Sequence, residues 1–403
     1  MILIVVVDGM PDRPINGRTP LSVAKKENLD SIADLGINGI MDPIAPGIRP
    51  GSDTSHLALL GYDPHKYYGG RGPIEAAGVG IEVKPGDVAF RANFATVEGE
   101  GDIFDKVVVD RRAGRIQDTS QLIEAIRREV ELPVEFFIER GTGHRAAVVF
   151  RGEGLSANVT DTDPKRIGEK VKMCKPLSED ASRTAEIVNE FMRKVHEVLE
   201  KHPLNAERVA RGLPKANAIL LRGAGSTPHV ESFNDRYGLK LSVVSATALI
   251  KGVGAIVGGR VVTPEGATGN RNTNVAAKVD AALKEMKRSD VVLLHFKAAD
   301  ELGHDGDFSG KVEFIERLDA ELAKLLDLDA CVIVTSDHST PVSVREHTAD
   351  PVPVAIKYEG VRRDEVRVFS EFEAYKGGLC RIRGVDLLRI ALDLTNLTEK
   401  FGA

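Results

Sequence analysis

The stretch from residue 291 to residue 339 reads VVLLHFKAADELGHDGDFSGKVEFIERLDAELAKLLDLDACVIVTSDHS, and it decides the fold class. It begins with the apolar run Val291–Phe296 and ends with a second such run, Cys331–Thr335. Between them, Lys311–Leu326 carries its apolar side chains at helical spacing. Because both runs are continuously apolar rather than alternating, they are predicted to be buried strands of a parallel sheet. A strand–helix–strand unit of this kind indicates an α/β domain with helices on both faces of a mostly parallel sheet.

The N-terminal run Ile2–Val7 is predicted to be a third strand of that sheet, whereas the middle of the chain follows another pattern. From about residue 67 to 225 polar and apolar residues alternate, as in PVEFFIER, which is typical of half-exposed antiparallel strands. One long helix, Arg183–Lys201, interrupts them and ends before Pro203. The sequence therefore predicts a discontinuous core, residues 1–66 and 226–403, with a smaller inserted α+β domain at residues 67–225.

The composition excludes several classes of function. With 42% hydrophobic and 28% charged residues, a formal charge of -6 and no long basic run, the chain is expected to bind neither nucleic acid nor a membrane. The opening apolar run is too short to span a bilayer. The three cysteines Cys174, Cys331 and Cys380 form no CxxC pair, so we expect a reducing, cytoplasmic location. The glycine-rich GVGAIVGGR at 252–260 has Val257 where a dinucleotide loop needs glycine, so no nucleotide cofactor is expected.

Acidic and imidazole side chains follow each of the three predicted strands. Asp8 follows the first, Asp300 and His304 follow the second, and Asp337 and His338 follow the third. A lone aspartate after a strand is more often a turn residue or a helix cap. In open α/β sheets, however, ligands bind beyond the carboxyl ends of the strands, and three strands delivering such residues to one edge indicate a site.

A cluster of three aspartates requires counter-charge, because carboxylates brought together raise one another's pKa. Two divalent cations would convert a charge of about -3 into a net positive site suited to an anionic substrate. Mixed carboxylate and imidazole ligands favour Mn²⁺, with Zn²⁺ or Co²⁺ as alternatives and Mg²⁺ less suited.

The segment GSDTSH, residues 51–56, contains a serine that has two interpretations. Ser52 precedes an apolar run and is predicted to be the N-cap of a helix that begins around Asp53. The same position makes it a candidate nucleophile, since a helix N-terminus favours phosphate and a metal can activate the hydroxyl.

These motifs together are similar to those of the alkaline-phosphatase superfamily, and the chain most closely resembles its cofactor-independent phosphoglycerate mutases of archaeal type. The resemblance rests on VVVDGMPDRP, GSDTSHLALLGYDP, GRGPIEAAGVG, FRANFATV, DRRAGRI, PEGATGNRNTN, HFKAADELGHDGDFSGKVEFIERLD and VTSDHSTP. It implies an alkaline-phosphatase-like core and a phosphorylated serine at Ser52. It also implies that one metal is held by Asp8, Ser52, Asp337 and His338, and the other by Asp300, His304 and His347.

A mutase must also bind phosphate and carboxylate, and arginine binds both through a planar fork. By resemblance, Arg222 and Lys251 are expected to contact substrate, and so is the DRRAGR cluster, with Arg111, Arg112 and Arg115 as candidates. Asp110 is our candidate proton shuttle. The chain lacks the long inserted domain and the histidine-rich loop of the larger mutases, so their glycerate pocket transfers only in part.

The resemblance implies interconversion of 3-phosphoglycerate and 2-phosphoglycerate in glycolysis and gluconeogenesis, without 2,3-bisphosphoglycerate as cofactor. Alternatives are another phosphohydrolase or small-molecule phosphotransferase of the superfamily and, from a different class, a non-catalytic metal-binding protein. The expected partner is a small phosphorylated substrate, and the sequence leaves open whether the chain forms a homo-oligomer.

Overall fold

A computed structural model describes residues 1–400 and Gly402, and it divides the chain into two compact units. Unit 1 comprises residues 1–68 together with those from 231 onward, and unit 2 comprises residues 69–230. The sequence analysis placed these boundaries after residues 66 and 225. No helix in the described part of the chain is long and apolar enough to cross a membrane.

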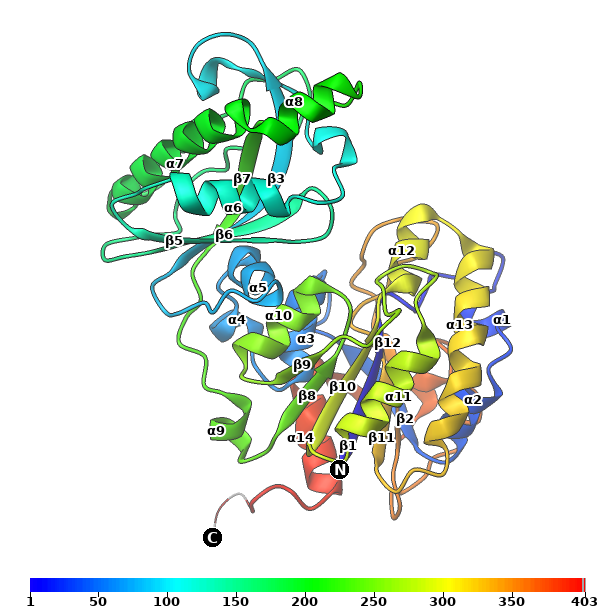
Figure 1. Cartoon of the computed structure of the whole chain (residues 1–403). Helices are drawn as coiled ribbons and strands as arrows, with labels where there is room; N and C mark the ends of the chain where they lie inside the picture. Colours follow the sequence, from blue (N-terminus) through cyan, green and yellow to red (C-terminus); the bar gives the residue numbers. More distant parts are fainter. Residues whose placement is uncertain (401, 403) are drawn as a thin grey trace. The chain divides into compact units, whose positions relative to one another are not determined.

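Unit 1 is built on an eight-stranded sheet with the order β13-β2-β12-β11-β1-β10-β8-β9 (Figure 1). Its strands are β1 (Ile2–Val7), β2 (Ile37–Asp42), β8 (Leu241–Val244), β9 (Arg260–Val262), β10 (Val291–Phe296), β11 (Cys331–Thr335), β12 (Val352–Lys357) and β13 (Cys380–Arg383). β12 runs antiparallel to β11 and β2, and the other neighbouring pairs are parallel. The prediction of a mostly parallel sheet is therefore confirmed.

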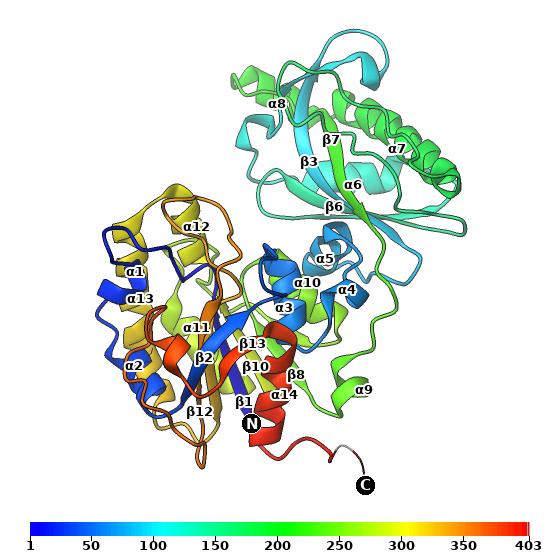
Figure 2. The same ribbon diagram turned by 180° about the vertical axis from the view of Figure 1, so that it is seen from behind.

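Helices cover both faces of this sheet, because each central strand presents apolar side chains to both sides. Leu3, Val5 and Val7 pack with α11 (Val275–Glu285), α13 (Phe308–Leu322) and α2 (Glu27–Asp34). On the opposite face lie α3 (Ser52–Leu59), α10 (Ala248–Ile256) and α14 (Gly384–Leu394), and α3 contacts both α10 and α14 (Figure 2). The remaining α-helices of unit 1 are α1 (Pro20–Val23), α4 (Pro64–Tyr67), α9 (Phe233–Tyr237) and α12 (Ala298–Asp305), and two short 3-10 helices are η4 (Ala323–Leu325) and η5 (Ala374–Lys376).

Unit 2 has an antiparallel sheet in which β3 pairs with β4, β6 and β7, and β6 pairs with β5. Its strands and α-helices are α5 (Arg71–Gly78), β3 (Val88–Glu98), β4 (Val107–Asp110), α6 (Ser120–Glu129), β5 (Glu135–Arg140), β6 (Arg145–Arg151), α7 (Ser182–Lys201), α8 (Pro203–Ala210) and β7 (Ala218–Gly225). Three short 3-10 helices are η1 (Ile103–Asp105), η2 (Ala113–Arg115) and η3 (Glu179–Ala181). Alternate side chains of β3 point to opposite faces of this sheet. Val88 and Phe90 pack into the core with α6 and α7, whereas Ala89 packs against α5.

Candidate functional site

The strands β10, β1 and β11 end at the same edge of the sheet. In the parallel register Val7 lies opposite Phe296, and Val6 lies opposite Thr335. The chain therefore leaves all three strands at one level, and the residues that follow converge. Seven predicted side chains come together here: Asp8, Ser52, Asp300, His304, Asp337, His338 and His347.

The first group consists of Asp8, Asp337 and His338, all fully buried. The Nε2 atom of His338 lies 3.4 Å from Oδ1 of Asp8 and 3.3 Å from Oδ2 of Asp337. The same Nε2 lies 3.1 Å from Oγ of Ser52, a residue that is only 5% exposed. The predicted nucleophile thus stands directly beside three candidate metal ligands.

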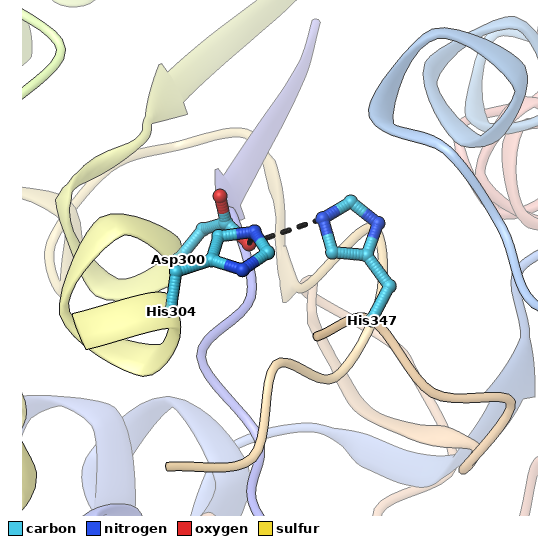
Figure 3. Close-up of side chains that lie close together, drawn as sticks. All are labelled: Asp300, His304 and His347. Carbon is cyan, nitrogen blue, oxygen red and sulfur yellow. Dashed lines mark ion pairs between the residues drawn. The ribbon is translucent and has the colours of Figure 1, made fainter. Parts of the chain in front are cut away.

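The second group consists of Asp300, His304 and His347, and Figure 3 shows the two imidazoles converging on the carboxylate. Oδ1 of Asp300 lies 3.4 Å from Nε2 of His304 and 3.3 Å from Nε2 of His347. The two histidines come from α12 and from the loop before β12, and both are partly exposed. This group is therefore more open than the first.

Each of the three candidate histidine ligands has its Nδ1 atom held by an oxygen. The partners are the hydroxyl of Thr340 for His338 at 3.1 Å, the carbonyl of Arg345 for His304 at 2.9 Å and the carbonyl of Pro50 for His347 at 2.9 Å. A hydrogen on Nδ1 leaves the lone pair on Nε2, the atom that faces the carboxylates. Ligating histidines are usually oriented in this way by their other nitrogen.

The distances between candidate ligand atoms fit a metal ion. A tetrahedron with ligands at about 2.0–2.1 Å from the metal has edges of about 3.3–3.4 Å. The separations of Nε2 from carboxylate oxygen in both groups are 3.3 Å or 3.4 Å. In addition, Oδ2 of Asp337 is buried without a hydrogen-bond partner. Such an atom is rare in a folded protein, and this one has a free lone pair with which to bind an ion.

Ser52 is not the N-cap that the sequence analysis predicted, and the cap lies one residue earlier at Gly51. The hydroxyl of Thr54 accepts from the N–H of Gly51 at 3.1 Å and donates to its carbonyl at 3.0 Å. Because Thr54 closes the first turn, Ser52 is the first residue of α3 and its Oγ is free to face His338. The ring of His56 lies one turn along the helix and holds the Ser52 carbonyl at 2.7 Å.

Lys297 is a site residue that sequence reasoning missed. It follows β10 directly, and its Nζ lies 3.0 Å from Oδ1 of Asp8, 2.6 Å from Oδ2 of Asp300 and 3.5 Å from Oγ of Ser52. The ammonium thus bridges a carboxylate of each group and reaches the nucleophile. A lysine after a strand carries no motif of its own, so the sequence offered no signal for it.

His295 was also missed, because it looks like part of an apolar strand. Its Nε2 lies 2.9 Å from Oδ2 of Asp8, and its Nδ1 lies 3.1 Å from Oγ of Ser245. The ring fixes the Asp8 oxygen that does not face His338, and so orients the other one toward the first group.

Repulsion among the carboxylates is concentrated on Asp337, whose pKa burial and the Asp8 carboxylate raise well above its usual range. Burial and the Asp300 carboxylate also raise the pKa of Asp8, but Lys297, His295 and His338 together outweigh them, and the pKa lies below its usual range. For Asp300 the effect of burial is likewise outweighed, by His347 and Lys297, and the pKa is lowered. Neighbouring carboxylates thus raise the pKa of both Asp337 and Asp8, as expected, but only Asp337 ends above its usual range, because Lys297 and two histidines lower the pKa of Asp8.

Burial lowers the pKa of His338 to about 3, so its imidazole is neutral at pH 7. A neutral imidazole is the form that binds a metal. Burial alone would lower the pKa of His347, but the Asp300 carboxylate raises it to about 9.

Unit 2 carries a group of cationic side chains on and beside β3 and β7. Arg91 lies opposite Arg222, whose Nε is buried without a hydrogen-bond partner. Burial lowers the pKa of His144 to about 4, and the charges of Arg145, Arg112 and Arg222 add to this effect. Arg91 is paired with Glu75 at 2.9 Å, so the three arginines that act on the neutral imidazole are the ones suited to an anion.

The predicted substrate residues of the DRRAGR segment differ in their surroundings. Arg111 forms a two-pronged ion pair with the buried Asp163 at 3.1 Å and 2.6 Å. The carboxylate of Asp110 accepts from the N–H groups of Arg112 and Gly114 at 2.7 Å and 2.8 Å and so braces the turn. The side chains of Arg112 and Arg115 are exposed, and that of Lys251 on α10 is half-buried. None of the three forms an ion pair within the described residues.

Comparison with known proteins places these features in a family. A family model described as 2,3-bisphosphoglycerate-independent phosphoglycerate mutase matches residues 33–205. A protein of Archaeoglobus fulgidus with that name is 73% identical over the whole length of both chains. A second, from Methanopyrus kandleri, is 53% identical and is covered to 98% by the whole of this chain.

Solved structures agree with this assignment. The structure of a Pyrococcus horikoshii protein, 40% identical, matches the whole chain and 99% of its own length with a TM-score of 0.84. A cofactor-independent phosphoglycerate mutase from Thermoplasma acidophilum, 34% identical, matches 98% of this chain and 99% of its own with a TM-score of 0.72.

Proposed function

This chain belongs to the family of 2,3-bisphosphoglycerate-independent phosphoglycerate mutases, and we propose that it interconverts 3-phosphoglycerate and 2-phosphoglycerate through a phosphoserine on Ser52. The observation that carries the proposal is the position of Ser52. Its Oγ lies 3.1 Å from Nε2 of His338, at the first residue of a helix and beside both candidate metal groups.

The donor set supports two divalent cations. Asp8, Ser52, Asp337 and His338 would hold one, and Asp300, His304 and His347 would hold the other. When bound, these ions would lower the cost of ionising the Ser52 hydroxyl and of charge on the phosphoryl oxygens. Since imidazole and carboxylate are mixed, we propose Mn²⁺ as the physiological ion, with Zn²⁺ or Co²⁺ as substitutes.

The side chains around Ser52 define how the transfer begins. Oγ loses its proton and attacks phosphorus, the bond from phosphorus to the glycerate oxygen breaks, and the phosphoryl group is left on Ser52 while that oxygen takes up a proton. The other glycerate hydroxyl then loses its proton and attacks the same phosphorus, the bond from phosphorus to Oγ breaks, and Oγ takes up a proton. Lys297, 3.5 Å from Oγ, is placed to contact a phosphoryl oxygen, and the first turn of α3 adds its free N–H groups. Both are charges or dipoles fixed before the reaction, which is the arrangement that stabilises a developing anion.

The glycerate part of the substrate needs binding groups of its own, and we propose Arg112, Arg115, Arg222 and Lys251. The unpartnered Nε of Arg222 supports its role most directly. The sequence analysis also proposed Arg111. The ion pair with Asp163 indicates that Arg111 mainly stabilises the loop at residues 161–165.

Glycerate must lose a proton from one hydroxyl and gain one at the other, and we propose Asp110 for this exchange. The neutral imidazole of His144 is a second candidate from the same region, because the charge of Asp110 raises the pKa of this histidine and so favours proton uptake. Replacing each separately, as Asp110→Asn and His144→Gln, and recording kcat against pH assigns the role. The shuttle is the residue whose loss removes an ionisation from the profile.

The test of the mutase proposal is a product count. The metal-stripped chain, restored with Mn²⁺, is incubated with 3-phosphoglycerate, and 2-phosphoglycerate and free phosphate are both measured. The proposal requires that 2-phosphoglycerate predominates. Mainly free phosphate would identify a hydrolase, and neither product with any divalent ion would identify a non-catalytic metal-binding protein. Adding each ion back separately also tests the preference for Mn²⁺.

The cellular setting follows from the same proposal. A glycolytic substrate and three cysteines without a paired motif support a cytoplasmic location. Assembly into a homo-oligomer is left to a measurement of molar mass in solution.

A further inference from the structure

Thr340 lies between the two candidate metal groups, and its hydroxyl touches a ligand of each. Fully buried beyond β11, it places Oγ1 2.6 Å from Oδ1 of Asp300 and 3.1 Å from Nδ1 of His338. The VTSDHSTP motif includes this residue, but neither the resemblance nor the mechanism described above gives it a role, and only its contact with His338 has been described.

The direction of these hydrogen bonds is determined by their chemistry. A hydroxyl has one hydrogen to donate, and an ionised carboxylate can only accept. The hydroxyl of Thr340 therefore donates to Asp300 and accepts from Nδ1–H of His338. This places the lone pair of His338 on Nε2, the atom 3.1 Å from Oγ of Ser52 and 3.3 Å from Oδ2 of Asp337.

We infer that Thr340 is a positioning residue that couples the two metal sites, by orienting Asp300 in one and selecting the tautomer of His338 in the other. The inference rests on the proposed function only for the identity of the reaction. Its claim about metal ligands stands on the contacts of Thr340 alone.

Two glycines make room for Thr340, and each adjoins a candidate ligand. Gly9 follows Asp8 with φ +65, and a Cβ there would lie 2.6 Å from Oγ1 of Thr340. Gly303 precedes His304, and a Cβ there would overlap the Thr340 carbonyl and lie 2.9 Å from its Cγ2. The ligand-bearing segments thus close around this threonine, which explains why both positions lack a side chain.

A buried ion pair holds the backbone of Thr340 in place. Nζ of Lys311 donates to the Thr340 carbonyl at 2.9 Å and to Oδ2 of Asp12 at 2.9 Å, and both side chains are fully removed from solvent. The Asp12 carboxylate also accepts from the N–H of Val342 at 3.1 Å and 3.2 Å. Lys311 and Asp12 thus hydrogen-bond to the backbone at Thr340 and at Val342. Because the two charges are also paired with each other, the loop has little freedom to turn the Thr340 hydroxyl away.

The first test needs no variant. The chain contains 10 histidines, and two-bond ¹⁵N–¹H spectra of the metal-free full-length protein distinguish their tautomers, with His338 assigned by comparison with His338→Gln. The inference requires hydrogen on Nδ1 of His338. Hydrogen on Nε2 instead would overturn it.

The second test compares Thr340→Val, which replaces the hydroxyl by a methyl group, with Thr340→Ser, which keeps the hydroxyl. Loss of a partner that orients ligands costs about 10–100-fold in metal affinity. We expect Thr340→Val to weaken Mn²⁺ binding at both sites by this factor in calorimetric titration. We expect Thr340→Ser to stay within about threefold of the parent chain.

Other outcomes separate a structural role from coupling. If Thr340→Val lowers only the unfolding temperature and leaves both Mn²⁺ affinities unchanged, or weakens only one, coupling is refuted. Since no measurement involves phosphoglycerate, failure of the mutase proposal would not change these results.

Discussion

Replacing Lys297 by methionine removes a cation from the middle of the site while keeping a side chain of similar length. In the parent chain Nζ lies 2.6 Å from Oδ2 of Asp300, 3.0 Å from Oδ1 of Asp8 and 3.5 Å from Oγ of Ser52. Three consequences with different signs follow from these contacts.

The metal-free protein should become less stable. Asp8 is fully buried and Asp300 is 2% exposed, and the variant leaves both without their nearest cation. Removing one partner of a buried ion pair costs about 3–5 kcal/mol. We therefore expect the free energy of unfolding, measured in urea with a chelator present, to fall by that amount.

Metal affinity should change in the opposite direction, because Lys297 and the metal ions compete for the same carboxylates. Two unit charges about 4 Å apart interact with about 4 kcal/mol at an effective dielectric constant of 20. Relief of part of this repulsion is enough to tighten Mn²⁺ binding by about 10–100-fold. Calorimetric titration measures this directly.

Turnover should nevertheless fall, because the variant lacks a fixed positive group next to the transferring phosphoryl. Loss of one such donor typically lowers kcat by about 10²–10³. The control is Lys297→Arg, which keeps the charge and should change less than Lys297→Met in all three measurements. Weaker Mn²⁺ binding by Lys297→Met would refute the competition argument, and an unchanged kcat would refute contact with the phosphoryl group.

Three further predictions test other parts of the molecule. His347→Asn should bind one Mn²⁺ per chain instead of two and lose turnover, whereas two bound ions would contradict the second site. Arg222→Gln should raise the KM for 3-phosphoglycerate by at least about tenfold, the loss expected for one charged hydrogen bond. Arg111→Gln should mainly destabilise the chain, because it leaves Asp163 unpaired. Equal effects of the two variants on KM would contradict the separate roles given to Arg222 and Arg111. Burial lowers the pKa of Lys278 from 10.5 to about 8. Between pH 8 and pH 10.5 the unfolded chain therefore binds more protons than the folded chain, and the free energy of unfolding should rise with pH by about 3 kcal/mol. Urea unfolding should show that Lys278→Met lacks this rise, and an equal rise in both chains would assign it to other groups.

The fold was predictable where the sequence repeats one physical pattern. Continuous β-branched runs gave β1, β10 and β11 with their observed bounds, because strands buried on both faces tolerate little else. The other five strands of this sheet, β2, β8, β9, β12 and β13, were not predicted. Three of them, β2, β12 and β13, lie toward one edge of the sheet and include Asn38, Pro353 and Arg381, which dilute the apolar pattern.

Five candidate ligands could be predicted because they follow strands, namely Asp8, Asp300, His304, Asp337 and His338. His347 was expected only from the family resemblance, and the supporting residues were not predicted at all. Lys297, His295 and Thr340 act through contacts across strands, which depend on register rather than on local sequence. Arg111 is a further example, since its partner Asp163 lies 52 residues away along the chain. Residues that orient a site are thus visible only once the strands are assembled.

The central claim is that the phosphoryl group passes through Ser52. Its most direct test is a rapid chemical quench of the Mn²⁺-loaded chain with radiolabelled 3-phosphoglycerate, followed by digestion and identification of the labelled peptide. We predict label on Ser52 that appears before 2-phosphoglycerate and disappears into it on a chase with unlabelled substrate, with none on Ser52→Ala, which should keep its metal but lose turnover. Formation of 2-phosphoglycerate by Ser52→Ala, or in the parent chain without label ever reaching Ser52, would contradict the claim.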